Sequence, residues 1–152
     1  MAAPDATLRI RPVGAAEREP WEALWSGYLD FYRATIPASV RDATWARLHD
    51  PAVPLHALVA EDEGRLVGLA HYVFHASTWT LGPYCYLQDL FTAPEARGRG
   101  VGRALIEAVA SEARTAGADR VHWLTMADNA PARALYDTLA DQPGFIQYRR
   151  IL

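Results

Sequence analysis

The chain has 152 residues and a formal net charge of −3. That length fits one domain with a full hydrophobic core, so we expect a single domain over residues 1–152. The charge excludes a global positive field that would attract nucleic acid or an anionic membrane, and no apolar run is long enough to span a bilayer. The start of the chain lacks the apolar core of a signal peptide. We therefore expect a cytoplasmic protein that binds neither nucleic acid nor membrane.

The first half of the chain carries strand and helix patterns. Alternation of polar and apolar residues predicts strands, and apolar residues at spacings of three and four predict helices. Prolines and a capping serine mark the helix ends. The predicted elements are a strand over 7–13, a helix over 15–36 ended by Pro37, a helix over 39–50 capped by Ser39, and two strands within 55–77 around the turn 61–64.

The second half alternates strands and helices. Such an order connects parallel strands through helices, so we predict an α/β fold with a mixed sheet, first antiparallel and then parallel, and helices on both faces. Pro131 suits the first position of the last helix. The predicted elements are a strand over 84–92, a helix to about Arg114, a strand over 120–126, a helix over 132–140 and a closing strand over 144–152.

Three glycines, Gly98, Gly100 and Gly102, stand at every second position where the loop after 84–92 becomes a helix. Glycine favours helices poorly, but it lets an anion approach the unpaired amides at a helix start. Arg97, Arg99 and Arg103 would add charge for phosphate oxygens. The pattern therefore predicts a phosphate site, with a solvated turn as the alternative.

Two other phosphate motifs fail on spacing. A nucleoside-triphosphate loop needs Lys followed by Ser or Thr after its last glycine, and this chain has Arg103 and Ala104 there. A dinucleotide fingerprint needs a glycine at position 103.

Two motifs together give the chain a family resemblance. The segment "RGRGVG" (97–102) matches the Q/R-x-x-G-x-G/A signature of the GNAT superfamily of acetyl-CoA-dependent N-acetyltransferases. The segment "NAPARALY" (129–136) is similar to the second motif of that superfamily, and Gly144-Phe145 follows. The segment "YCYLQDLFT" (84–92) resembles the polyamine- and histone-acetylating branch, which usually carries Glu where this chain has Gln88.

This resemblance implies that the chain binds acetyl-CoA as co-substrate and needs no metal. Backbone amides of the glycine loop would hold the pyrophosphate, the end of strand 84–92 would lie along the pantetheine arm, and Asn129 would contact the cofactor from the neighbouring strand. The implied cofactor residues are Leu90, Phe91, Thr92, Arg97, Gly98, Arg99, Gly100, Val101, Gly102, Arg103 and Asn129.

Acetyl transfer to an amine requires an uncharged amine, a donor for the developing oxyanion and a proton for the leaving thiolate. By the family motif Tyr136 supplies that proton, whereas its helical spacing alone predicts core packing. Asp89 is the candidate general base, or the residue that orients a water for that role, and the alternative is a carboxylate that binds strand-end amides. Gln88 cannot accept a proton, so it is assigned to the substrate side.

The acceptor side is expected on the first helices, where Tyr28 and Tyr32 lie one turn apart and can contact an amine by cation–π attraction. Packing in the core is the alternative. His71 and His75 lack metal-ligand spacing, so we expect structural or surface roles for them. An exposed Trp79 in the loop over 75–84 would indicate a dimer contact, and relatives that are often dimers lead us to expect a homodimer.

The resemblance leaves the acceptor open. The leading hypothesis is a small primary amine such as a polyamine, an amino acid or a lysine-like compound. The alternatives are acetylation of protein lysines or N-termini, and a non-catalytic domain that binds acyl-CoA. A plain nucleotide-phosphate module is a fourth reading, against which the second motif argues.

Overall fold

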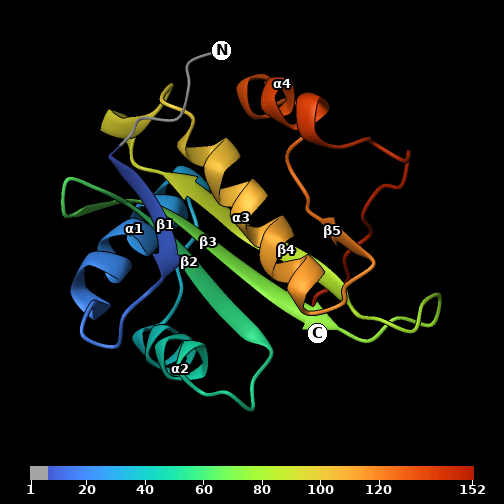
Figure 1. Cartoon of the computed structure of the whole chain (residues 1–152), viewed down its shortest axis with the longest axis horizontal. Helices are drawn as coiled ribbons and strands as arrows, with labels where there is room; N and C mark the ends of the chain where they lie inside the picture. The colour runs from blue at the N-terminus through green and yellow to red at the C-terminus, as the bar shows by residue number, and fades with distance from the viewer. Residues whose placement is uncertain (1–6) are drawn as a thin grey trace.

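The computed structural model describes residues 7–152, and its strands form one five-stranded sheet in the order β1-β2-β3-β4-β5 (Figure 1). The first four strands pair antiparallel, and β5 pairs parallel to β4, which confirms the predicted mixed sheet. The strands are β1 (Leu8–Pro12), β2 (Leu55–Asp62), β3 (Arg65–His75), β4 (Tyr84–Thr92) and β5 (Arg120–His122).

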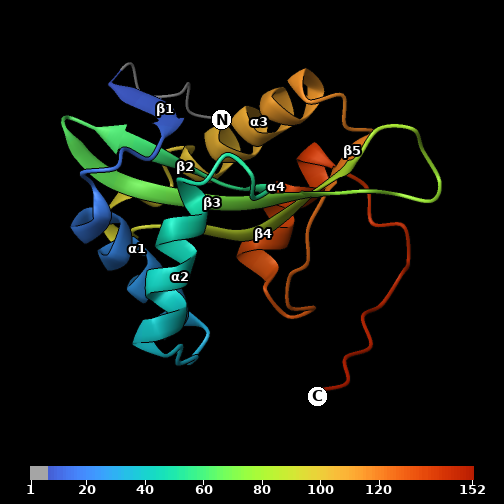
Figure 2. The same cartoon turned by 90° about the horizontal axis from the view of Figure 1, so that it is seen from below.

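Helices cover both faces of the sheet, as predicted. In Figure 2, α1 and α2 lie on one side of the strands and α3 on the other. Each face has its own core: the α1-side core includes Trp21 and Phe91, and the α3-side core includes Leu87 and Leu105. The helices are α1 (Arg18–Phe31), α2 (Ala38–Leu48), α3 (Val101–Thr115) and α4 (Ala130–Leu139), with a short 3₁₀ helix, η1 (Pro94–Ala96).

The first helix ends earlier than the sequence pattern predicts. Its chain leaves the helix at Arg33, which adopts a left-handed φ of 51°. The amides of Arg33 and Ala34 donate to the carbonyls of Asp30 and Leu29. This hydrogen-bond pattern is a Schellman end. The end of α1 is therefore set by this turn, six residues before Pro37.

The predicted cap of the second helix is wrong. Pro37 occupies the N-cap position of α2, and no side-chain hydrogen bond caps the helix. Ser39 lies inside the first turn of α2. A proline that cannot donate an N–H is tolerated at such a helix start, where amides have no intrahelical partner anyway.

The C-terminal part of the sheet is shorter than predicted. The predicted strand 120–126 is only three residues long, Arg120–His122, and the predicted strand 144–152 is absent. These last residues instead form a tail that runs away from the sheet (Figure 2). Its apolar side chains are exposed, including Phe145 at 81%. A strand needs a partner edge as well as a strand-like sequence, and β5 offers an edge of three residues.

No helix between residues 7 and 152 combines the length and the apolar character that crossing a membrane requires.

Candidate active site

A β-bulge in β4 turns Asp89 toward the α1 face of the sheet. In the register with β3, His71 faces Asp89 and Tyr72 faces Leu87, so Gln88 is the extra residue. Before the bulge, Leu87 packs in the α3-side core, and after it Phe91, also an odd-numbered residue, packs in the α1-side core. One inserted residue reverses the alternation of a strand. Asp89 therefore lies on the same face as Phe91, beside α1.

The outer edge of β4 is open at the bulge. The pairing with β5 ends at Tyr86 and His122, and among the described residues nothing pairs with that edge over 87–92. The two parallel strands thus separate just before the bulge. An open edge presents backbone N–H and C=O groups to an extended ligand. Leu90, Phe91 and Thr92 lie on this edge.

The open edge leads into the glycine loop. Gly98 and Gly100 adopt left-handed φ angles of 77° and 81°, and a Cβ on either would meet no atom within 4 Å. Glycine is thus required there by the backbone turn. Gly100 is the N-cap of α3, and the first intrahelical bond runs from the Ala104 amide to the Gly100 carbonyl. The amides of Val101, Gly102 and Arg103 therefore precede the helical ladder and favour an anion.

The three arginines of the loop contact protein groups in this structure. Arg97 donates to the Thr92 carbonyl and lies over the rings of Phe31 and Phe91. Arg99 pairs with Asp62 at 2.9 Å, and Arg103 donates to the Thr138 hydroxyl at 2.8 Å. In this structure the three guanidinium groups are therefore engaged with other groups of the protein.

Tyr136 lies beside this loop on α4. Its ring packs edge-on against Trp123, with centroids 5.4 Å apart and an interplanar angle of 70°. Burial raises the pKa of Tyr136, and the nearby Tyr32 adds to the shift. The hydroxyl consequently keeps its proton at neutral pH, as a proton donor must.

Five of the residues predicted for the site line one narrow hollow, which measures about 20 Å³, roughly the space of one water molecule. They come from α1, β4 and α4, so the fold brings together segments that are far apart in the sequence. The lining residues are Tyr28, Tyr32, Leu87, Gln88, Leu90, Trp123, Leu124 and Tyr136. Asn129, also predicted, stands outside this set at the N-cap of α4.

Asp89 lies among tyrosines. Burial raises the pKa of Tyr28, and the negative charge of Asp89 and a hydrogen bond to it add to the shift. Burial and then the Asp89 charge also raise the pKa values of Tyr32 and Tyr86. Gly27 permits this arrangement, because a Cβ there would lie 2.8 Å from Phe91. The close approach of α1 to β4 therefore brings Tyr28 to Asp89.

His71 is the residue of this neighbourhood that sequence reasoning missed. Its Nδ1 lies 3.1 Å from Asp89 Oδ2, and Trp21 Nε1 donates to its Nε2 at 3.0 Å. The histidine is 2% exposed. No local signal could have found this contact, because it depends on the register of β3 and β4 and on the bulge between them.

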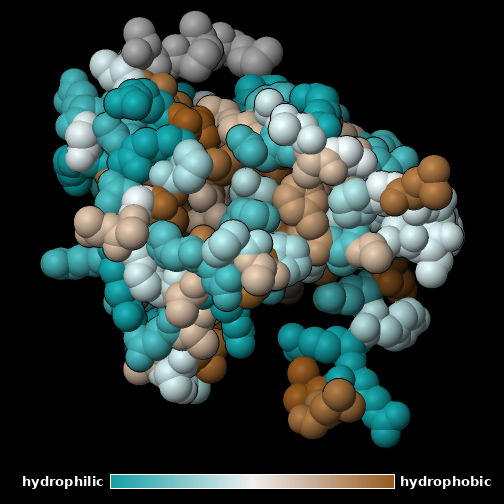
Figure 3. Space-filling model, turned by 60° about the horizontal axis from the view of Figure 1, so that its bottom comes forward, coloured by the Kyte–Doolittle hydropathy of each residue, from teal (hydrophilic) through white to brown (hydrophobic). Residues whose placement is uncertain are grey.

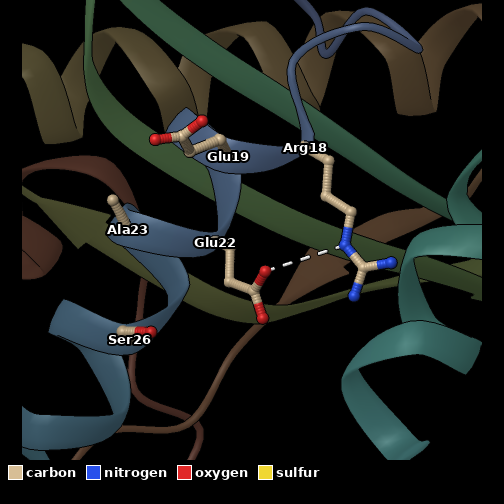
Figure 4. A pocket seen from close by; sticks show the side chains of 5 residues that line it. All are labelled: Arg18, Glu19, Glu22, Ala23 and Ser26. Carbon is tan, nitrogen blue, oxygen red and sulfur yellow. Dashed lines mark ion pairs between the residues drawn. The ribbon is translucent and has the colours of Figure 1, made fainter. Parts of the chain in front are cut away.

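A second hollow, of about 450 Å³, lies on the outer face of α1 (Figure 4). Its lining residues, Arg18, Glu19, Glu22, Ala23 and Ser26, all belong to that helix. Arg18 and Glu22 form an ion pair at 3.7 Å. Walls from a single helix make a surface depression, so this hollow does not compete with the site at the β4 bulge. The described part of the chain holds no group of three His, Cys, Asp or Glu side chains placed for a metal ion.

The sequence is similar to a known protein family and to several known enzymes. The acetyltransferase (GNAT) family matches residues 21–140. The D-amino-acid N-acetyltransferase of Saccharomyces cerevisiae is 35% identical over 143 residues, which cover 93% of this chain and 89% of that protein. The thialysine N-epsilon-acetyltransferase of Sus scrofa is 38% identical over 92 residues, which cover 55% of this chain and 54% of the relative.

The fold has solved counterparts. An aminoglycoside N-acetyltransferase in complex with CoA superposes with a TM-score of 0.75 at 20% identity, over 100% of this chain and 96% of that one. The match of the family over most of the chain, together with the yeast relative, settles membership. The chain is an acyltransferase that belongs to the GNAT acetyltransferase family.

Proposed function

We propose that this enzyme transfers an acetyl group from acetyl-CoA to the primary amine of a small molecule by direct attack in a ternary complex. The observation that carries the proposal is the place of Asp89. The bulge places its carboxylate on the α1 face, near enough to Tyr28, Tyr32 and Tyr86 for its charge to help raise their pKa values, beside the open β4 edge that leads into the glycine loop.

The residues that would hold acetyl-CoA are those of the edge and the loop. Bound there, it supplies a thioester as the acetyl donor. The open edge over 87–92 offers backbone partners to an extended arm, and the amides of Val101, Gly102 and Arg103 offer donors to a diphosphate. A backbone amide near Leu90 would donate to the developing oxyanion, which is typically worth about 3–4 kcal/mol.

On the acceptor side, Tyr28 and Tyr32 would hold the amine as a cation over their rings, next to Asp89. An alkylammonium must lose a proton before it attacks, which costs about 4–5 kcal/mol at neutral pH. Asp89, directly or through a water, would take that proton. Tyr136 would give its proton to the leaving thiolate. Alignment of amine and thioester supplies most of the remaining gain.

Two features support a small amine over a peptide. The hollow at Tyr28, Gln88 and Tyr136 is lined in large part by aromatic side chains, which can contact a cationic amine. The relatives from Saccharomyces cerevisiae and Sus scrofa are named for amino-acid acceptors, a D-amino acid and thialysine. We therefore propose an amino acid or a related small amine, such as a polyamine or lysine-like compound, as the acceptor.

The test is release of free thiol from acetyl-CoA in the presence of D- and L-amino acids, thialysine, polyamines, aminoglycosides and basic peptides. We expect turnover with a small amine. Turnover with peptides alone would instead indicate a protein acetyltransferase. Binding of acetyl-CoA without turnover on any amine would indicate a non-catalytic acyl-CoA-binding domain.

We propose in addition that the enzyme forms a homodimer. Apolar side chains are exposed on the β3–β4 loop and on the tail: Trp79 is 75% exposed, Ile146 76% and Tyr148 90%. Figure 3 shows hydrophobic side chains on a segment that projects from the body. Exposed apolar groups on this scale mark an interaction site. The single domain over residues 1–152 and the cytoplasmic location stay predictions.

A further inference from the structure

A buried hydrogen-bonded chain runs from α1 through β3 to the reacting side of β4. Trp21 is fully buried, His71 is 2% exposed, and the side chain of Asp89 is 13% exposed. The indole nitrogen lies 3.0 Å from Nε2 of His71, and Nδ1 lies 3.1 Å from Asp89 Oδ2. This series of hydrogen bonds thus connects the α1-side core to the Asp89 carboxylate, next in sequence to two residues, Gln88 and Leu90, that line the narrow hollow.

The hydrogen bonds assign the proton of His71. An indole N–H donates and cannot accept, so Nε2 must be the acceptor and carries no proton. The ring proton is then on Nδ1, from which it is donated to the carboxylate. Both ring nitrogens have hydrogen-bond partners. A second proton, on Nε2, would point at the indole N–H of Trp21, so that two donors would face each other. His71 is therefore neutral in this arrangement, with one tautomer selected.

Packing holds the ring in that orientation. Trp25 meets His71 edge-on at 4.9 Å between centroids, and Trp21 contacts it at 5.9 Å. Among the described residues His71 is the one polar side chain in the buried core. A buried polar group costs free energy unless it is hydrogen-bonded, and leucine would fill this place without that cost. The residue therefore needs an explanation beyond packing.

The bulge at Gln88 explains why a histidine is buried at position 71. It turns a carboxylate onto a mostly apolar face, at a point where the strand loses its regular pairing. His71 is the cross-strand partner of Asp89 and gives that carboxylate a fixed donor. Tyr28, on α1, lies close enough to this carboxylate for the charge of Asp89 to add to the rise of its pKa that burial causes. The donor from His71 therefore holds the orientation of the Asp89 carboxylate on the α1 face of the sheet.

We propose that Trp21 and His71 are positioning residues: the indole N–H selects the His71 tautomer with its proton on Nδ1, and that N–H aims the Asp89 carboxylate at the acceptor amine. The role of Asp89 toward the amine rests on the proposed function. The tautomer of His71 and its selection by these hydrogen bonds do not depend on the proposed function.

Two measurements test the proposal separately. The first is the ring nitrogen spectrum of the ligand-free protein, by long-range ¹H–¹⁵N NMR, which reports the tautomer without any turnover. We expect His71 to carry its proton on Nδ1, because the Trp21 indole can only donate to Nε2 and the Asp89 carboxylate can only accept from Nδ1. A proton on Nε2 in the unmodified enzyme would overturn the proposal.

The second measurement is steady-state kinetics with acetyl-CoA and the amine that gives the fastest thiol release. His71→Phe keeps a ring of similar size and loses the donor, so we expect kcat/KM for the amine to fall about tenfold or more, with the Kd of acetyl-CoA changed less than about twofold. His71→Asn restores an N–H near the place of Nδ1 and should recover activity to within about threefold. His75→Asn, four residues along the same strand, is the control and should change neither parameter.

The outcomes separate the two proposals. If His71→Asn is no more active than His71→Phe, or if His71→Phe weakens acetyl-CoA and amine equally, His71 only fills the core and the positioning role is wrong. If the enzyme turns over no amine, the proposed function is wrong, and the NMR result alone decides whether the hydrogen-bonded chain selects the tautomer.

Discussion

The guanidinium of Arg103 donates a hydrogen bond to the hydroxyl of Thr138 at 2.8 Å, which ties the first turn of α3 to α4. The two helices also touch where Gly102 meets Leu135, since a Cβ on that glycine would lie 3.5 Å from the leucine. Tyr136 follows Leu135 on the same helix. The glycine loop at the start of α3 is thus fixed against the helix that carries the candidate acid.

Replacing Tyr136 by phenylalanine should lower kcat about tenfold or more and leave the Kd of acetyl-CoA nearly unchanged. The change removes one hydroxyl and keeps the ring that packs on Trp123. A group that acts only as proton donor contributes to turnover and little to ground-state binding. Thiol-release kinetics and calorimetric titration with acetyl-CoA give the two values.

Tyr84→Phe is the matched control, because the Tyr84 hydroxyl has no hydrogen-bond partner among the described residues and this tyrosine is not among the site residues. We expect it to turn over at the unmodified rate. If Tyr136→Phe does the same, Tyr136 is not the acid and its place on α4 is explained by packing alone.

Gly100→Asp should weaken acetyl-CoA binding at least about tenfold, because a carboxylate at the N-cap of α3 would repel and displace a diphosphate. Gly117→Asp provides the comparison. Gly117 has a left-handed φ of 75°, close to the 81° of Gly100, and it too has open space for a Cβ. Unlike Gly100, it lies just after the C-terminal end of α3. Both variants carry the same backbone strain and the same added charge. Equal acetyl-CoA affinity in the two variants would refute the loop assignment.

Local sequence signals account for much of this structure. The strand-like apolar run over 84–92 predicts β4 with its observed bounds, and the segment 61–64 predicts the tight turn between β2 and β3, where Glu63 and Gly64 have positive φ. The glycine loop and the helix after it are likewise encoded within a few residues. Features of this kind depend on neighbours in the chain, and a single sequence shows them.

Features that depend on pairing between distant strands were not predictable in this way. The bulge at Gln88 is visible only in the register of β4 against β3, and it alone decides that Asp89 faces α1. The contact of His71 with Asp89 follows from the same register. The tail over 144–152 has a strand-like sequence, yet β5 ends at His122 and leaves it no long edge to join. Local pattern reports the capacity to form a strand, and the partner edge decides whether one forms.

Cys85 should make the enzyme less stable at alkaline pH. The thiol is fully buried, and burial raises its pKa from 9.0 to about 11. Its contribution is complete below pH 9, the unfolded value, and is lost as the pH rises toward 11, because the unfolded chain ionises first. Between pH 8 and pH 10 the loss should be about 1 kcal/mol.

Urea denaturation of the unmodified enzyme and of Cys85→Ala at both pH values isolates this effect from the buried tyrosines, which both proteins share. The difference in unfolding free energy between the two proteins should shrink by about 1 kcal/mol at the higher pH. A difference that stays constant would show that the thiol does not titrate differently in the folded state.

The exposed tail should hold two copies of the chain together. Phe145 and Ile146 are 81% and 76% exposed, and burying each such side chain is worth about 2 kcal/mol. Aspartate at both positions should convert a particle of twice the 16.8 kDa chain mass into one of the single mass, measured by light scattering after gel filtration. Aspartate at Arg149 and Arg150 alters the charge of the same segment without removing an apolar group, so that variant should remain dimeric. An unmodified enzyme of single mass at micromolar concentration, or a Phe145 and Ile146 variant that stays dimeric, would show that the tail is not the contact between copies.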